Sequence, residues 1–393
     1  MSSGRPRRVL VVGLGISGMA TAIRLHEAGW EPVVVERAPS RRTGGYFVGL
    51  FSVGKTAAAR LGVLARMHLR TPPDHHTWTV DRVGRRQHSA GFLDQPGNPE
   101  GVMRGDIEDA LWKRVDGRIE VRFATVPVAV RQTPETVGVT LLDTADDRTY
   151  EEEFDLVVGA DGLRSTVRRL VFGADATFMR SLHAVVCAFS LDHQVPGYPD
   201  SDQVILAQPG RSLWVFPFRD RTPTALFAYR TRNVDAEFRN DPVTTLTSRF
   251  AGLDGGGMVA FALEQLRRQP DRLFDSVHQV RMPRWHDGRV VLLGDAAWCL
   301  TLYSGMGASA GMIGAVALGD ELSARPDDLP AAFGAWEKRM RPLVRKHQLL
   351  AYVKAQFFVP SNPFAAWIRG KVVAVVTRRL TSEASAGVNR GAT

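Results

Sequence analysis

The chain has 393 residues, 44% of them hydrophobic and 23% charged, values typical of a globular protein and not of a disordered or fibrous one. The formal net charge of +9 does not predict nucleic-acid binding, because the arginines are spread along the chain without a recognition motif or a domain-sized basic stripe. With only Cys187 and Cys299 present, a disulfide framework and a cysteine-rich metal site are excluded, and a reducing, cytoplasmic setting is expected. No uninterrupted apolar run reaches the length of about 18 residues that a transmembrane helix needs.

The first predicted elements form a βαβ unit. An apolar strand at residues 9–12 is followed by a glycine turn, by a helix whose apolar positions recur at helical spacing up to Gly29, and by a second strand at 32–35 that ends at Glu36. In the turn, GLGISG, Gly13 allows a tight bend, Gly15 lets the backbone approach a pyrophosphate, and Gly18 allows close helix packing. Glu36 is placed to accept both hydroxyls of an adenosine ribose. The unit predicts a site for FAD or NAD, with a chance glycine turn as the alternative.

The rest of the chain alternates between helical and strand patterns. A basic, glycine-rich loop at 41–54 precedes further predicted helices at 55–64, 106–114 and 307–322, and strands at 75–87, 120–125, 137–142, 155–158 and 290–293. Residues 184–230 contain several strand-like runs rich in Phe, Trp and Val, which predict an antiparallel sheet. The tail after Pro330 is mostly helical by pattern, with breaks expected at Pro342 and at 360–363.

Two more motifs decide between the dinucleotides. They are LVVGADGLRSTVR at 156–168 and GRVVLLGDAAWCLTLYSGMGASAG at 288–311. Together with GLGISG, and in this order, they resemble the signatures of class A flavoprotein monooxygenases, the para-hydroxybenzoate hydroxylase-like family that includes tetracycline-degrading monooxygenase, and the resemblance runs along most of the chain. It implies an α/β fold: a Rossmann-like FAD-binding domain of the glutathione-reductase type (residues 1–74, 100–175 and 280–325), an inserted mixed β-sheet substrate domain (75–99 and 176–279) and a C-terminal helical region (326–393).

The resemblance also implies which residues hold the cofactor. Asp295 matches an aspartate on a ribityl hydroxyl, residues 305–308 match a helix start beside the flavin ring, and Asp161 matches an aspartate near the pyrophosphate. Arg104 matches a flavin-contacting arginine, and Val126 matches an adenine contact. The candidate FAD-binding residues are Gly13, Gly15, Ser17, Gly18, Glu36, Arg37, Arg41, Arg42, Arg104, Val126, Asp161, Asp295, Gly305, Met306, Gly307 and Ala308. The alternatives are an Asx turn at Asp161, a helix cap at Asp295, and solvated loop charges at Arg41 and Arg42.

The activity implied by the resemblance is monooxygenation. NADPH or NADH would reduce the FAD, and O2 would then oxygenate a small, largely apolar, aromatic or polycyclic substrate through a flavin C4a-hydroperoxide, with a role in secondary metabolism such as antibiotic biosynthesis. The protein is expected to be a monomer or homodimer without a metal. Aromatic and apolar residues of the predicted sheet are the candidates for the substrate pocket, with ordinary core as the alternative: Phe189, Leu206, Trp214, Phe216, Phe227 and Tyr229. No catalytic base is identified, and Tyr303 is the nearest candidate by its place in the third motif.

The chain departs from the family pattern at three positions. Trp298, Leu302 and Gly314 stand where the family commonly has histidine, proline and aspartate. Because the proline-bearing loop touches the flavin face at which oxygen reacts, the alternatives are a flavin-bound cyclase or binding protein without redox activity, and a reductase or oxidase of the same fold. For residues 357–380 the prediction is a helix packed against both domains, and the alternative is a helix that rests on a membrane surface.

Overall fold

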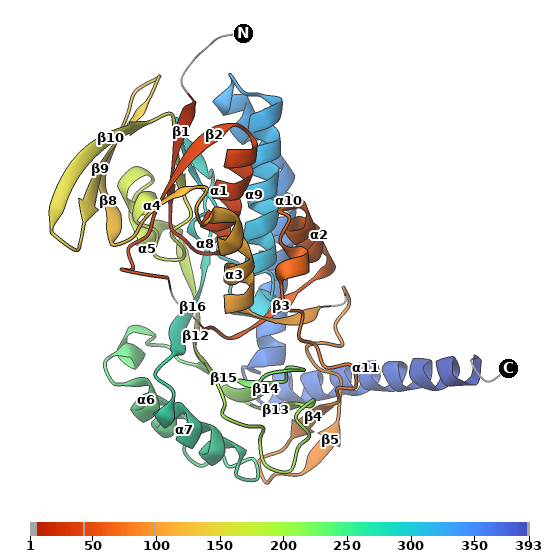
Figure 1. Cartoon of the computed structure of the whole chain (residues 1–393). Coiled ribbons are helices and arrows are strands. Elements are labelled where there is room, and N and C mark those ends of the chain that lie inside the picture. The colour runs from red at the N-terminus through yellow and green to blue at the C-terminus, as the bar shows by residue number, and fades with distance from the viewer. Residues whose placement is uncertain (1–5, 42–43, 98, 391–393) are drawn as a thin grey trace.

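A mostly parallel sheet forms the centre of the upper half of the molecule in Figure 1. The computed structural model describes residues 6–41, 44–97 and 99–390. In this part of the chain, the first sheet has the strand order β17 (His286–Asp287), β18 (Val290–Leu292), β11 (Leu156–Gly159), β1 (Arg7–Val12), β2 (Trp30–Val35) and β7 (Glu120–Arg122). The pairings from β18 to β7 are parallel, and β17 pairs antiparallel with β18. The near-continuous apolar character of the four inner strands, β18, β11, β1 and β2, is explained by burial on both faces.

Helices and a small sheet cover the two faces of this central sheet. The long helix α9 (Gly307–Ala324) packs against three others: α1 (Ile16–Glu27), α2 (Ser52–Arg60) and α10 (Leu329–Phe358). Helix α3 (Arg104–Val115) packs on α1. An antiparallel sheet packs beside β1 and α4 (Thr166–Val171), and its strands are β8 (Thr125–Gln132), β9 (Val137–Asp143) and β10 (Arg148–Phe154).

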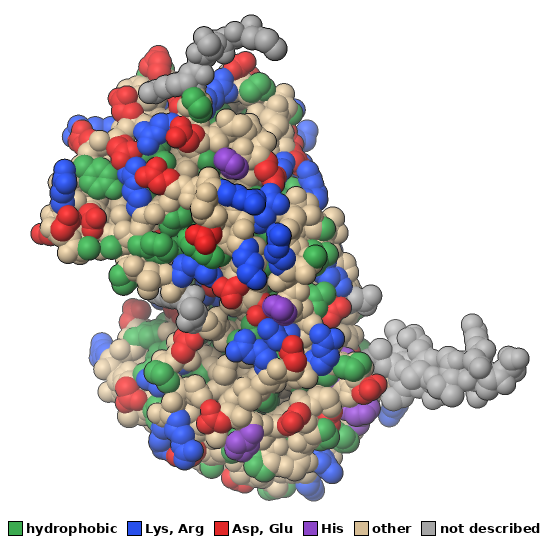
Figure 2. Space-filling view, in the orientation of Figure 1, with side chains coloured by type: hydrophobic (Ala, Val, Ile, Leu, Met, Phe, Trp, Pro, Cys, Tyr) green, Lys and Arg blue, Asp and Glu red, His purple; other side chains and the backbone are tan. Residues whose placement is uncertain are grey.

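A larger, mixed sheet forms the lower half of the molecule in Figure 1. Its strand order is β16 (Arg272–Val280), β12 (Met179–Ser190), β15 (Thr224–Arg230), β14 (Arg211–Phe216), β13 (Gln203–Gln208), β4 (Thr77–Val80) and β5 (Arg86–His88). One face packs in a separate core with α6 (Pro242–Arg249) and α7 (Met258–Arg268), whereas the other contributes to the main core of the molecule. Figure 2 shows that the surface narrows to a waist between the two halves.

The two halves are interleaved in sequence. Both sheets take strands from separated segments, and the strands at 77–88 and 179–280 are inserted between those of the first sheet. The predicted fold class, an α/β cofactor domain with an inserted mixed sheet and C-terminal helices, is therefore confirmed. Short elements complete the connections: β3 (Phe47–Leu50), β6 (Glu100–Met103), α5 (Asp175–Phe178), α8 (Asp295–Trp298), η1 (Leu64–Arg66), η2 (Asp235–Phe238) and η3 (Leu302–Ser304).

The C-terminal helices differ from the prediction in two ways. Helix α10 continues through Pro342, so the expected break there is wrong. Proline removes one backbone hydrogen bond, but Met340 and Val344 on either side are buried in the main core, and this packing holds the helix together. Helix α11 (Pro363–Arg390) leaves the body of the molecule at its C-terminal end (Figure 1) and keeps one face exposed, in contrast to the expected helix packed against both domains. Within the described residues, no helix has both the length and the apolar character needed to cross a bilayer.

Candidate active site

The first glycine loop is tightly packed at two positions and open at the third. A Cβ atom on Gly13, whose φ is +105°, would lie 2.6 Å from the carbonyl oxygen of Ala160, and one on Gly18 would lie 1.8 Å from that of Gly13. A Cβ on Gly15 would meet no atom within 4 Å. Gly15 also precedes the first turn of α1, where unpaired backbone N–H groups favour an anion. The loop therefore fits a pyrophosphate at Gly15.

Glu36 lies in the wall of a cavity of about 240 Å³ beside this loop. Its carboxylate accepts hydrogen bonds of 2.9 Å from the backbone N–H groups of Leu14 and Ala38, which fixes its orientation and leaves further lone pairs for a ligand. The other candidate residues at its wall are Gly13, Gly15, Arg37, Arg41, Arg104, Val126 and Asp161. Arg41 forms an ion pair with Asp109 and lies 4.8 Å from the centre of the Trp112 ring. Arg42 lies outside the described residues.

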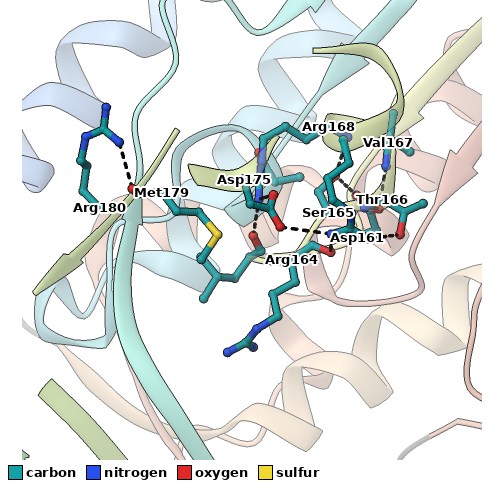
Figure 3. Close-up of polar contacts among 12 residues, drawn as sticks. Asp161, Arg164, Ser165, Thr166, Val167, Arg168, Asp175, Met179 and Arg180 are labelled. Carbon is teal, nitrogen blue, oxygen red and sulfur yellow. Dashed lines mark hydrogen bonds and ion pairs between the residues drawn. The ribbon is translucent and has the colours of Figure 1, made fainter. Parts of the chain in front are cut away.

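Asp161 is a capping residue as well as a wall of this cavity. Its carboxylate accepts hydrogen bonds from the backbone N–H groups of Thr166 (2.6 Å) and Val167 (3.2 Å) and from the hydroxyl of Ser165 (2.5 Å), as Figure 3 shows. Burial raises the pKa of Asp161, although these hydrogen bonds act in the opposite direction. These contacts cap the first turn of α4 and are not those of an Asx turn at Asp161, which would involve the backbone N–H two residues on. Asp161 also lies in the cavity wall, where the cofactor interpretation places it.

Asp295 and the start of α9 face a second cavity, which has a volume of about 340 Å³. The Asp295 side chain is surrounded by protein on most sides but opens into this cavity, and burial raises the pKa of its carboxyl. Gly307 would have open space around a Cβ atom. The candidate residues in the wall of this cavity are Gly15, Ser17, Arg104, Asp295, Gly305, Gly307 and Ala308, whereas Met306 is buried in the core. Because Gly15 and Arg104 line both cavities, the two form one elongated site.

The opposite wall of the 340 Å³ cavity is the inner face of the large sheet. Val186, Ala188, Phe216 and Leu226 line it, and Phe216 stacks on Phe47 with ring centroids 4.4 Å apart. The cavity therefore joins the motif residues of the first half to an apolar surface of the second half.

Four of the predicted pocket residues lie on the wrong face of this sheet. Successive side chains of a strand point to opposite faces, and Val186 and Ala188 face the cavity, so that Phe189 faces the second core. Leu206, Phe227 and Tyr229 belong to the same second core with α6 and α7. Of the remaining two candidates, Phe216 lines the cavity, and Trp214 lies on the same face but stacks on Phe358 with ring centroids 4.5 Å apart.

Tyr303 does not line the cavity, although its neighbours Thr301 and Leu302 do. Its side chain is 2% exposed and packs against Phe358, with ring centroids 5.4 Å apart. Burial raises the pKa of its hydroxyl. The position of Tyr303 therefore gives no support to the expectation that it is a catalytic group.

Trp298 and Gly314, two of the three departures from the family pattern, pack against each other. Trp298 is buried against Trp285 and Trp336, with ring centroids 4.6 and 5.6 Å away. A Cβ atom on Gly314 would lie 2.9 Å from the Trp298 ring, and the backbone carbonyl of Gly314 accepts a 2.9 Å hydrogen bond from the Trp336 indole. The large side chain at 298 thus requires the small one at 314, and neither lines the 340 Å³ cavity. Leu302, the third departure, does line it.

Among the polar residues of the cavity wall that sequence reasoning missed are Tyr46, Thr224, Asp275, Ser276, His278 and Thr301. Burial raises the pKa of the Tyr46 hydroxyl, which therefore stays protonated at neutral pH. The hydroxyls of Thr224 and Thr301 are buried and find no hydrogen-bond partner among the described residues. Thr301 also has a φ of +72°, a strained conformation for a β-branched residue. Only the third motif pointed to this loop, and nothing in the sequence marked Tyr46 or Thr224.

Comparisons with known proteins agree with this arrangement. The model of the FAD binding domain family matches residues 7–326. The chain is 29% identical over 356 residues to an uncharacterized protein of Mycobacterium tuberculosis, covering 88% of this chain and 92% of that protein. It is 27% identical over 366 residues to a flavin-dependent monooxygenase of an unknown prokaryotic organism, covering 92% of each.

Among solved structures, the fold is similar to the crystal structure of tetracycline destructase Tet(51). The TM-score is 0.76 at 27% sequence identity, and the similarity covers 95% of this chain and 96% of that chain. Since the family match extends over most of the sequence and includes all the residues that line the two cavities except Phe358, the chain belongs to the FAD binding domain family.

Proposed function

We propose that this protein is an FAD-dependent monooxygenase that uses NADPH or NADH and O2 to oxygenate a small, largely apolar organic substrate, aromatic or polycyclic, in secondary metabolism. The observation that carries the proposal is the 340 Å³ cavity, in which Asp295 and the start of α9 face the apolar inner surface of the large sheet. A substrate on that surface would lie against the reactive ring of the cofactor. The similarity to a flavin-dependent monooxygenase and to a tetracycline destructase supports this class of reaction and of substrate.

The residues around the elongated site fit FAD from end to end. Glu36 would accept the hydroxyls of the adenosine ribose, the open space at Gly15 would take the pyrophosphate, and Asp295 would bind a hydroxyl of the ribityl chain. The start of the 18-residue helix α9 would place partial positive charge near the flavin ring. When bound, the flavin would supply both the hydride acceptor and the oxygen-activating centre, and the protein would bind and orient the reactants.

The cavity wall also indicates how a substrate would be held. Val186, Ala188, Leu226 and Phe216 give it an apolar surface that would exclude water. The unpartnered hydroxyls of Thr224 and Thr301 would be satisfied by polar groups on the substrate, because a buried hydroxyl without a hydrogen bond is costly, by about 1–3 kcal/mol. The best-fitting substrate is a ring system with a hydroxyl or carbonyl group at its edge.

The test is oxidation of NADPH and of NADH by the purified yellow protein, followed together with oxygen uptake, over a panel of polycyclic phenols. The proposal predicts that one or more compounds stimulate oxidation and that 18O from 18O2 appears in the product. Asp295→Asn should retain less FAD, while Asp146→Asn, in an exposed turn, should behave as the parent protein.

Other outcomes would overturn the proposal in distinguishable ways. Bound FAD that neither coenzyme reduces, with or without ligands, would assign the protein to the non-redox class that Leu302 in the cavity wall leaves open. Coenzyme oxidation that yields only hydrogen peroxide or a reduced product across the whole panel would assign it to the oxidases or reductases of this fold.

A further inference from the structure

The excess positive charge of the chain is concentrated in one segment. Residues 338–382, which form most of α10 and the first part of α11, contain ten Lys and Arg and no Asp or Glu. The other 348 residues contain 40 Lys and Arg against 41 Asp and Glu, and Figure 2 shows basic and acidic side chains interspersed over the body of the molecule. The arginines are spread along the chain as expected, but the net excess of positive charge comes from this one segment.

The same segment carries most of the exposed apolar side chains. Among the described residues, ten large apolar side chains are exposed between residues 349 and 376, and only five are exposed in the rest of the structure. The ten are Leu349, Leu350, Tyr352, Val353, Phe364, Trp367, Ile368, Val372, Val375 and Val376. Single exposed apolar residues need no explanation, but a concentrated group of them marks an interaction site. Both the charge and the apolar exposure thus point to the same segment of the chain.

Helix α11 has two faces of different character. Arg369 and Thr377, eight residues apart, attach one face to the body: Arg369 donates a 2.8 Å hydrogen bond to the carbonyl of Phe357, and the Thr377 hydroxyl accepts one of 2.8 Å from the backbone N–H of Ala90. The opposite face carries an apolar stripe at helical spacing, and it consists of Phe364, Trp367, Ile368, Val372, Val375 and Val376. Trp367 is 59% exposed, and the Lys371 ammonium lies 5.7 Å from the centre of its ring.

The C-terminal half of α10, up to the point where α11 follows it, also carries basic and exposed apolar side chains. Arg345 and Leu349 line a surface groove of about 720 Å³ together with Arg281 and Arg341. Arginines beside an apolar floor suit a phosphate whose attached chain is apolar. The groove and the stripe therefore favour the same kind of ligand.

We propose that the stripe of α11, with the adjoining end of α10, docks the protein onto an anionic lipid bilayer. Apolar side chains of a surface helix enter the boundary between headgroups and acyl chains, and neighbouring Lys and Arg are attracted to anionic headgroups. A second copy of the chain is disfavoured as the occupant, because pairing two such segments would bring together like charges without an acidic residue in either. Nucleic acid would leave the apolar stripe in water. This proposal is independent of the reaction that the enzyme catalyses.

Flotation of the full chain with lipid vesicles tests the proposal. Vesicles of equal parts phosphatidylcholine and phosphatidylglycerol should bind the protein, binding should weaken with added salt, and vesicles of phosphatidylcholine alone should bind it about tenfold less tightly. The variant Trp367→Ser/Val372→Ser/Val375→Ser should lose about tenfold or more in affinity for the anionic vesicles. A matched control, Val53→Ser/Val83→Ser, changes two exposed apolar residues elsewhere and should bind like the parent.

Folding of each variant is monitored by its FAD content and thermal unfolding, which substitutions at exposed positions should leave unchanged. Absence of binding to anionic vesicles, or equal binding by the parent and the triple variant, would overturn the proposal. Sedimentation equilibrium tests the remaining possibility, a dimer. If the parent protein dimerises but does not bind vesicles, and the triple variant is monomeric, the stripe binds a second copy of the chain.

Discussion

The guanidinium of Arg168, which is fully buried, donates a 2.9 Å hydrogen bond to the backbone carbonyl of Ala296. The same side chain donates to the carbonyl of Leu163 at 2.6 Å and forms an ion pair of 2.5 Å with Asp175 (Figure 3). Arg168 ends the second sequence motif, and Ala296 follows Asp295 in the third. One arginine therefore holds the two motifs together behind the cavities, so that its effect on the cofactor is through position and not contact.

Replacement of Arg168 should destabilise the protein and release FAD. We expect Arg168→Met to lower the free energy of unfolding by about 3 kcal/mol, because it breaks the ion pair of a fully buried arginine with the partly exposed Asp175 and leaves the carbonyls of Leu163 and Ala296 without their donor. The control is Arg169→Met, since Arg169 pairs with the same Asp175 but is 43% exposed, and it should cost less than about 1 kcal/mol. Urea unfolding and the flavin absorbance of each purified variant measure the two effects. Equal losses in the two variants would contradict the role of Arg168.

The pairing of Trp298 with Gly314 predicts a coupling between the two positions. Gly314→Ala should cost about 1–3 kcal/mol, because the added methyl group would lie 2.9 Å from the Trp298 ring. In the background of Trp298→His, whose side chain is smaller, the same substitution should cost less, and a double-mutant cycle in urea unfolding measures the difference. Gly334→Ala, in α10 with open space around its Cβ, should instead stabilise by up to about 1 kcal/mol. A cycle without coupling would show that the backbone relaxes around residue 314.

Local patterns predicted the cofactor half of the molecule well. The strand, glycine turn and helix at residues 7–27 are specified by neighbours in sequence, and Glu36 follows directly from them. Which residues of the large sheet face the cavity could not be predicted. The alternation of side chains along a strand defines two faces, but it does not tell which face turns toward the cofactor half of the molecule. The same holds for Tyr46 and Thr224, which the tertiary fold alone brings to the cavity. Helices α6 and α7 lie beyond the predicted strands at 184–230, in a stretch for which neither a helix nor a strand was predicted from the sequence.

The two faces of the large sheet should respond differently to substitution. Leu226→Ala removes apolar surface from the cavity wall and should raise the KM of the substrate identified by the oxidation assay about tenfold. Phe227→Leu, one residue later in the second core, should leave the KM unchanged and lower the free energy of unfolding by about 1 kcal/mol. Steady-state kinetics and thermal unfolding of both variants check this. A KM effect from Phe227→Leu equal to that of Leu226→Ala would place the substrate elsewhere.

The buried carboxylate of Glu237 should make stability depend on pH. Glu237 is 4% exposed and accepts hydrogen bonds from Tyr229 (3.0 Å), Thr231 (2.7 Å) and the Nε of Arg249 (3.0 Å). Burial acts to raise its pKa, but these hydrogen bonds, together with the charge of Arg249, lower it overall.

A carboxyl whose pKa is lower in the folded than in the unfolded chain stabilises the fold above the ordinary glutamate pKa of about 4.3, and this contribution is lost as the pH falls through the lowered value. Glu237→Gln should therefore be less stable than the parent by about 2 kcal/mol at neutral pH, and the difference should shrink as the pH falls below about 4.3. Urea unfolding from neutral to acidic pH measures it, with the exposed Glu135→Gln as control. A difference that stays constant with pH would show that the carboxylate charge is not what stabilises this part of the second core.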